Sequence, residues 1–167
     1  MDATDDSWFA VILEIMGEGK GLTFMRRLAE KDLYLRDGKT LITRLMAAGE
    51  FPIVANTYVD LAMDIVKTGA PIEWLPGHDP IPASTHLVGI YGYAPHPNAA
   101  KLYVDFVLSK EGQNVLANRI GKFPANPDVE SYLKKKTDGF KIYALNPAVM
   151  SRYDLISKQF REIFWKN

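Results

Sequence analysis

Near the N-terminus, apolar residues recur three and four positions apart, and a second set with the same spacing follows Gly17 and Gly19. This spacing predicts two amphipathic helices, each burying one face. Thr4, Asp5 and Asp6 precede the first apolar set, and any of them can serve as its N-cap. The apolar positions are Phe9, Ile12, Leu13 and Met16 in the first helix, and Leu22, Met25 and Leu28 in the second.

One segment in the first half of the chain changes pattern twice. Residues 51–55 form a short, uncharged apolar run, which is typical of a strand covered on both faces. Residues 58–67 then return to helical spacing. Where a strand of an open α/β sheet ends at a helix start, backbone N–H groups are unpaired and the helix dipole is positive, so ligands bind there. We therefore expect the chemistry of the chain to collect around Asn56, Thr57 and Tyr58.

The same two patterns predict the other elements. Residues rich in β-forming side chains predict strands and extended segments at 72–75, 85–93 and 141–145, and either a strand or an extended link at 33–35. A loop with the composition of a hinge occupies 76–82. Helical spacing predicts helices at 40–48, from Pro97, from Ser109 to about 118, at 130–136 and from 147 to about 165.

Two short motifs are compatible with phosphate or nucleic-acid binding but favour simpler interpretations. The GEGKG run at 17–21 has no preceding strand, and no Ser or Thr directly follows Gly-Lys, so we interpret it as a helix–turn–helix joint. The basic cluster 134–136 is short enough to be a solvated helix end. Twenty basic residues balance twenty acidic ones, which removes the bulk attraction typical of nucleic-acid binders, so we predict no nucleic-acid partner.

Composition narrows the class of protein further. The chain has 167 residues, 47% of them hydrophobic, which suffices for one domain with a core or for parts of two small lobes. It has no cysteine, so disulfides, thiolate metal sites and cysteine nucleophiles are excluded. Acidic residues follow Met1, no signal peptide is recognisable, and no apolar run has the length of a membrane span. If the protein is exported, we expect its targeting segment to lie outside this sequence.

Residues 94–113 carry a distinctive motif, APHPNAAKLYVDFVLSKEGQ. It resembles the C-terminal signature of periplasmic solute-binding proteins of ABC importers (extracellular solute-binding family 1), in the branch that contains the ferric-iron binders. The shared features are a proline-rich turn, Asn-Ala-Ala near a helix start, and then Phe-Val-Leu-Ser-Lys-Glu-Gly-Gln. Further pieces resemble the family in the same order: AAGE at 47–50, GAPIEW at 69–74, and GKFPANP at 121–127, where Phe123 stands at a position commonly held by tyrosine.

This resemblance implies an α/β, periplasmic-binding-protein type II fold, present as a C-terminal fragment with the second lobe and part of the first lobe. Residues 1–86 would form a second-lobe segment, 87–139 would belong to the first lobe, and 140–167 would return to the second lobe. The implied function is the solute-binding component of an ABC import system in the periplasm or otherwise outside the cytoplasmic membrane. It would capture a small polar solute between the lobes and deliver it to an ABC permease and ATPase complex.

The family contacts its ligand through three elements of the second lobe, and the resemblance maps each of them to this chain. The residues so implied are Asp5, Asp6, Ser7 and Trp8 in the first element, Gly38 and Thr40 in the second, and Asn56, Thr57 and Tyr58 in the third. Ferric-iron members carry adjacent tyrosines in the third element, whereas here Thr57 precedes Tyr58. We therefore expect no metal cofactor, with Fe³⁺ bound through Tyr58 as the alternative.

Hydroxyl and amide groups at these positions favour a polar organic or sugar-like solute. Asp5 and Asp6 either cap their helix or receive a cationic group, with Trp8 or Tyr58 as an aromatic face. Alternatively, Tyr58 is a core residue of its helix.

No nucleophile elbow, zinc motif or phosphate loop is present, so we predict that the protein is not an enzyme. Two other classes stay open, a free-standing α/β ligand-sensing or interaction domain and, less favoured, an enzyme on a related scaffold. A fragment with exposed apolar surface is also expected to self-associate.

Overall fold

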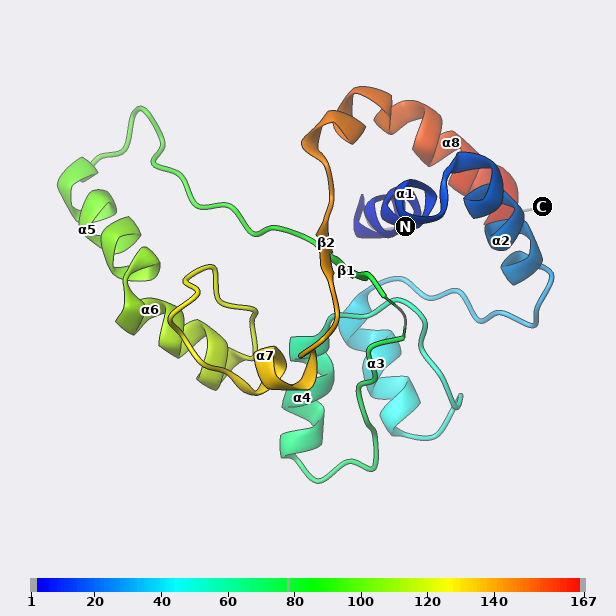
Figure 1. The fold of residues 1–167 in the computed structure, drawn as a ribbon, viewed down its shortest axis with the longest axis horizontal. Helices are drawn as coiled ribbons and strands as arrows, with labels where there is room; N and C mark the ends of the chain where they lie inside the picture. Colours follow the sequence, from blue (N-terminus) through cyan, green and yellow to red (C-terminus); the bar gives the residue numbers. More distant parts are fainter. Residues whose placement is uncertain (1–2, 78, 166–167) are drawn as a thin grey trace. The chain divides into compact units, whose positions relative to one another are not determined.

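The computed structural model describes residues 3–77 and 79–165, a helix-rich chain with two short strands in that part (Figure 1). It clusters into two compact units. Unit 1 comprises the chain up to Thr57, Pro76–Thr85 and the chain from Phe140 onward, and unit 2 comprises Tyr58–Leu75 and His86–Gly139. None of the described helices combines the length and apolar character needed to cross a membrane. The assignment of 1–86, 87–139 and 140–167 to two lobes stays a prediction.

The core of unit 1 is built from three helices, α1 (Ala3–Met16), α2 (Glu18–Ala29) and α8 (Tyr153–Phe164), which pack together in Figure 1. Their predicted apolar faces meet, and the ring of Phe9 contacts the ring of Phe160 edge-on at a centroid distance of 5.7 Å. Burying a side chain of this size stabilises the fold by about 1.5–3 kcal/mol. The buried members of this core are Phe9, Ala10, Ile12, Leu13, Met25, Ile156, Phe160 and Ile163.

The joint between α1 and α2 is the helix–turn–helix predicted from the GEGKG run. Gly17 ends the first helix with φ of +78°, a left-handed conformation that favours glycine. Gly21 lets α2 approach α1 closely, because a Cβ there would lie 2.7 Å from Leu13 Cδ2. Asp5 and Asp6 lie inside the first turn of α1, so the prediction that either one caps the helix is wrong. Their negative charges instead lie at the positive end of the helix dipole, where they stabilise the helix.

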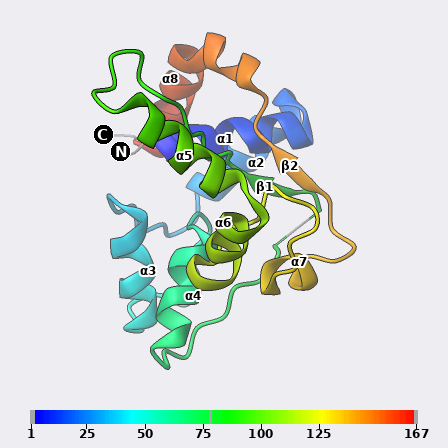
Figure 2. The same cartoon turned by 90° about the vertical axis from the view of Figure 1, so that its left-hand side faces the viewer.

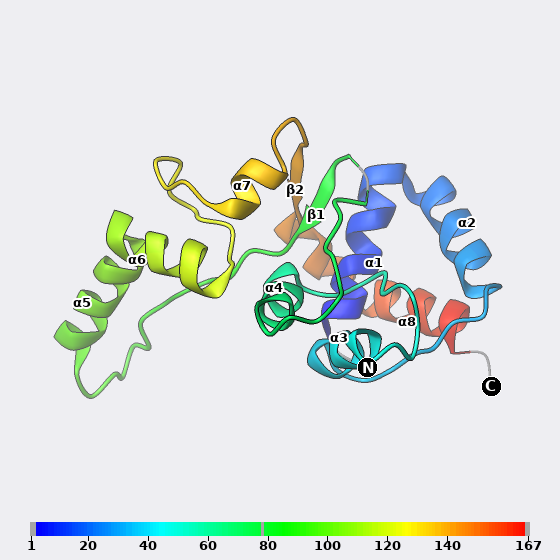
Figure 3. The same ribbon diagram turned by 90° about the horizontal axis from the view of Figure 1, so that it is seen from below.

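The sheet consists of two parallel strands of unit 1, β1 (Ile81–Ala83) and β2 (Ile142–Ala144), paired with Ile81 opposite Ile142 (Figure 3). The extended segment predicted at 141–145 is thus confirmed. The Tyr143 hydroxyl donates to Glu14 Oε2 at 3.1 Å, which ties β2 to α1. The 3₁₀ turn η2 (Pro147–Arg152) then leads into α8, so the predicted last helix is divided in two.

The strands predicted at 51–55, 72–75 and 85–93 are wrong, since all three segments are irregular. Ile53 is 78% exposed and Leu87 is 91% exposed, so these apolar runs are not covered on both faces. A strand needs a neighbour for its backbone groups, and β1–β2 is the sole ladder in the described part of the chain. Two parallel strands in a helix-rich chain are therefore all that this structure shares with the predicted α/β class.

Unit 2 contains α4 (Val59–Lys67), α5 (Pro97–Leu108), α6 (Lys110–Val115), the π-helical turn η1 (Leu116–Ile120) and α7 (Tyr132–Lys136). Figure 2 shows α5 leading into α6. Ser109 separates the two helices and accepts a hydrogen bond from the Gly112 N–H at 3.1 Å, which confirms the predicted cap. Buried Gln113 donates to the Val107 carbonyl at 2.8 Å and accepts from the Ala125 N–H at 2.6 Å, so it joins α5 to the following loop.

The first two residues of the motif GKFPANP pack on α4 within unit 2. Lys122 forms an ion pair of 2.7 Å with Asp60, and its ammonium lies 5.8 Å from the centre of the Tyr58 ring. Gly121 sits directly beside Asp60 and Met63. This segment therefore holds the helix that begins after Tyr58.

Candidate ligand-binding site

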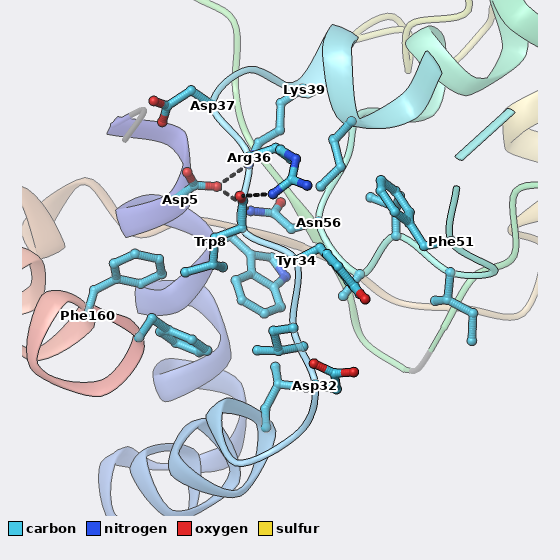
Figure 4. A pocket seen from close by; sticks show the side chains of 18 of the residues that line it. Asp5, Trp8, Asp32, Tyr34, Arg36, Asp37, Lys39, Phe51, Asn56 and Phe160 are labelled. Carbon is cyan, nitrogen blue, oxygen red and sulfur yellow. Dashed lines mark hydrogen bonds and ion pairs between the residues drawn. The ribbon is translucent and has the colours of Figure 1, made fainter. Parts of the chain in front are cut away.

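A cavity of about 490 Å³ opens in unit 1, within the size range of small-molecule sites (Figure 4). Its walls come from segments that are distant in sequence but belong to this one unit. They are residues 32–37 and 51–56, the side chains of Asp5, Trp8, Leu28, Lys39 and Ile42, and Phe160, Phe164 and Trp165 at the end of α8.

One end of the cavity is polar, and Asp5 is its centre. Asp5 Oδ1 forms an ion pair with the Lys39 ammonium and accepts a hydrogen bond of 2.8 Å from the Asn56 amide nitrogen. These partners lie 34 and 51 positions away in sequence. The side chains of Lys39 and Asp5 are 10% and 21% exposed, so the pair is screened less than a surface ion pair. The carboxylate thus fixes three segments at one point.

A pair of threonines supports this polar end from behind. The hydroxyl of buried Thr43 donates to the Lys39 carbonyl oxygen at 2.7 Å. Because a hydroxyl has one proton to donate, its oxygen accepts from the Thr57 hydroxyl, 2.5 Å away. The two bonds attach the end of segment 51–57 to α3 (Lys39–Ala47), and so hold Asn56 near Asp5.

The remaining walls are largely aromatic. Tyr34 and Phe51 stack with their ring centres 6.1 Å apart and their planes 16° apart, which joins the segments 32–37 and 51–56. Trp8 also lines the cavity, next to Tyr34 in the view of Figure 4. Phe160 and Phe164 on α8 contact each other with ring centres 4.9 Å apart. An apolar ligand body would therefore be surrounded by rings, with polar groups at one end.

Of the nine residues predicted for the site, Asp5, Trp8 and Asn56 line the cavity. Thr57 supports the site through Thr43. Gly38 precedes Lys39 with φ of +89° and thereby sets the start of α3, whereas Thr40 is exposed and does not line the cavity.

The other three predicted residues lie elsewhere. Ser7 is half-buried on α1 and does not line the cavity. Asp6 is buried, and within the described part of the chain its carboxylate oxygens have no partner at hydrogen-bonding distance. Its carboxylate is nevertheless the main cause that raises the pKa of the Tyr153 hydroxyl above its ordinary value. Tyr58 begins unit 2, where its ring is half-buried near Lys122.

Sequence reasoning missed Lys39, Arg36 and the aromatic residues Tyr34 and Phe51. One signal was available for Lys39, because a cation at the first position of a helix opposes the helix dipole and needs a compensating partner. Nothing local marks Tyr34 or Phe51, since both were assigned to strands or links. Their role depends on a contact between distant segments.

Within residues 3–77 and 79–165, no group of three or more His, Asp or Glu side chains is placed to hold a metal ion. No protein-family model, curated protein or solved structure matches the chain. The candidate site is therefore defined by the geometry of its own residues.

Proposed function

We propose that the protein is the solute-binding component of an ABC import system and that its unit 1 cavity receives a small solute. One observation carries this proposal. The three segments that the resemblance assigns to ligand contact, at the starts of α1 and α3 and at Asn56, converge on the Asp5 carboxylate beside an aromatic cavity. The predicted residues Asp5 and Asn56 meet directly, and from the third segment Lys39, which lies between the predicted Gly38 and Thr40, reaches the same carboxylate.

The geometry suits capture rather than chemistry on the bound molecule. Asp5 forms an ion pair with Lys39 and a hydrogen bond with Asn56, so the polar end of the cavity is already ordered before a ligand binds. Binding therefore loses little conformational entropy there. Apolar ligand surface that is buried against the aromatic walls contributes about 25 cal/mol of binding free energy per Å². On this proposal the complete protein has the type II periplasmic-binding-protein fold, is not an enzyme, works outside the cytoplasmic membrane and passes its solute to a permease and ATPase complex. The motif at 94–113 supports these features.

Binding is tested by thermal denaturation of the full chain against a panel of small organic solutes, with ferric ion included for the alternative through Tyr58. Tyr34→Ala removes an exposed ring from the cavity wall, and Tyr103→Ala is its control because Tyr103 is a comparably exposed tyrosine in unit 2. We expect at least one solute to raise the Tm of the wild type and of Tyr103→Ala, and to do so much less for Tyr34→Ala.

A panel without any stabilising solute, or equal stabilisation of all three proteins, would overturn binding in this cavity. The transport role has a separate test in the genome. We expect genes for a permease and an ATPase beside this one, and a chromosomal neighbourhood without transport genes counts against that role.

A further inference from the structure

The polar end of the cavity disfavours a cationic ligand. The Asp5 oxygen that would attract an amine already accepts from the Lys39 ammonium and the Asn56 amide. The Lys39 ammonium, whose side chain is only 10% exposed, already compensates this carboxylate, so a bound amine would meet a second positive charge at close range. The ion pair therefore argues against the interpretation of Asp5 as a receptor for a cationic group.

Arg36, in contrast, is a cation with unused hydrogen-bonding capacity. Its Nη1 donates to the Leu35 carbonyl oxygen at 3.0 Å, and its guanidinium carbon lies 5.8 Å from the centre of the Tyr34 ring. Among the described residues it forms no ion pair with a carboxylate. A guanidinium has five N–H donors, so four are left to receive a ligand, and their planar fork matches the two oxygens of a carboxylate.

The neighbouring carboxylates and aromatic rings are arranged in a way that suits an anionic ligand bound at Arg36. In Figure 4 the Asp37 carboxylate points away from the Arg36 guanidinium, and Asp32 lies at the opposite end of the wall made by Trp8 and Tyr34. Neither of these two carboxylates is therefore directed at the guanidinium fork in this view. An apolar body extending from that anion would lie against the rings of Trp8 and Tyr34.

We propose that the solute is a small amphipathic carboxylate, whose carboxylate group binds Arg36 and whose apolar, preferably aromatic, body lies along Trp8 and Tyr34. This inference rests on the proposed function and adds the charge and shape of the ligand to it. Arg36 acts here as the residue that determines specificity for an anion.

The test compares three probes that share a phenyl ring and a short alkyl chain but differ in charge: 3-phenylpropionate, 3-phenylpropylamine and 3-phenylpropanol. Each is titrated calorimetrically into the full-length wild type, Arg36→Gln and Arg44→Gln. Arg44 is the matched control, because it is an exposed arginine on α3 outside the cavity lining. We expect the acid to bind the wild type at least about tenfold more tightly than the amine. Arg36→Gln should weaken acid binding about tenfold and alcohol binding far less, and Arg44→Gln should change neither.

The outcomes separate the two proposals. If the alcohol or the amine binds as tightly as the acid, or if Arg36→Gln and Arg44→Gln bind the acid equally well, the carboxylate assignment is overturned while solute binding in the cavity stands. If none of the three probes binds but other solutes stabilise the wild type through Tyr34, the carboxylate assignment again fails alone. If no solute of any charge binds, both proposals fail.

Discussion

Lys39 occupies the first position of α3, where its positive charge faces the positive end of the helix dipole. The structure compensates this cost with the Asp5 carboxylate, which itself lies in the favourable first turn of α1. One ion pair thus relieves an unfavourable charge in one helix by using a favourable charge in another. Because the pair is poorly exposed, loss of either partner leaves the other one uncompensated.

Lys39→Met should therefore destabilise the protein by about 1–3 kcal/mol, because among the described residues the Asp5 carboxylate would keep only the Asn56 amide as a partner. The double variant Asp5→Asn/Lys39→Met should recover part of the loss, since no charge is then left unpaired. Urea unfolding of the single and double variants gives both values. A Lys39→Met protein as stable as the wild type would show that the ion pair contributes nothing.

A second residue-scale prediction concerns Lys136 in unit 2. A hydrogen bond to Glu73 is the main cause that raises the pKa of the Lys136 ammonium above its ordinary 10.5, and the rings of Trp74 and Tyr132 lie within 5.8 Å of it. Because the folded pKa is the higher one, the stabilisation is fully present below pH 10.5 and is lost as pH rises through the folded pKa.

The stability difference between the wild type and Lys136→Met should thus be constant from pH 8 to about 10 and shrink at higher pH. Chemical denaturation across this range measures it. Lys135→Met is the control, because Lys135 is exposed and adjacent to Lys136 in the sequence. The stability difference between the wild type and Lys135→Met should not shrink above about pH 10. A difference for Lys136→Met that does not change with pH would contradict the assigned cause.

At the scale of elements, helices were predicted well and strands poorly. Helices α1, α2, α5 and α8 follow from spacing within one segment, because a helix satisfies its own backbone groups. The runs 51–55 and 85–93 have strand composition but no partner strand, and strand formation depends on residues elsewhere. The segment predicted as extended at 141–145 contains β2, whereas its partner β1 begins inside the loop predicted at 76–82.

The joint between α5 and α6 gives an element-scale prediction. A Cβ on Gly112 would lie 2.0 Å from the Phe106 carbonyl oxygen, so Gly112→Ala should force the helices apart and cost about 1–3 kcal/mol. Gly19→Ala is the control, since a Cβ there meets nothing within 4 Å and alanine favours a helix by up to about 1 kcal/mol over glycine. In thermal or urea unfolding, Gly112→Ala should be less stable than the wild type and Gly19→Ala more stable. Equal stability of the two would contradict the close approach.

For the whole molecule, exposed apolar side chains predict self-association. In unit 2, α5 has no buried residue, with Leu102 71% exposed, and the irregular segment before it exposes Leu87 and Tyr93. Contacts between two copies would remove such surface from water. We expect light scattering to show concentration-dependent association, which Leu102→Gln weakens and the adjacent control Lys101→Gln does not. A monodisperse monomer at all concentrations would contradict this prediction.

The site could be predicted from sequence only in part, because several of its residues are brought together by contacts between distant segments. Asp5, Trp8 and Asn56 were named through the family resemblance, which supplies the long-range information that local patterns lack. Tyr34 and Arg36 belong to a segment without regular structure, so no periodicity indicates where their side chains lie. Their contribution depends on the contact of Tyr34 with Phe51, seventeen positions later in the sequence.

The interleaved order of the two units has a consequence for synthesis on the ribosome. The core of unit 1 joins α1 and α2 to α8, and β1 pairs with β2, so its early half is made long before its late half. At roughly 5–20 residues per second, α8 follows α1 after a delay on the order of ten seconds. Throughout that interval, α1 and α2 can pack on each other, but the apolar side chains that α8 later covers remain exposed. We therefore expect slower translation between residues 16 and 153 to prolong the exposure of this incomplete core.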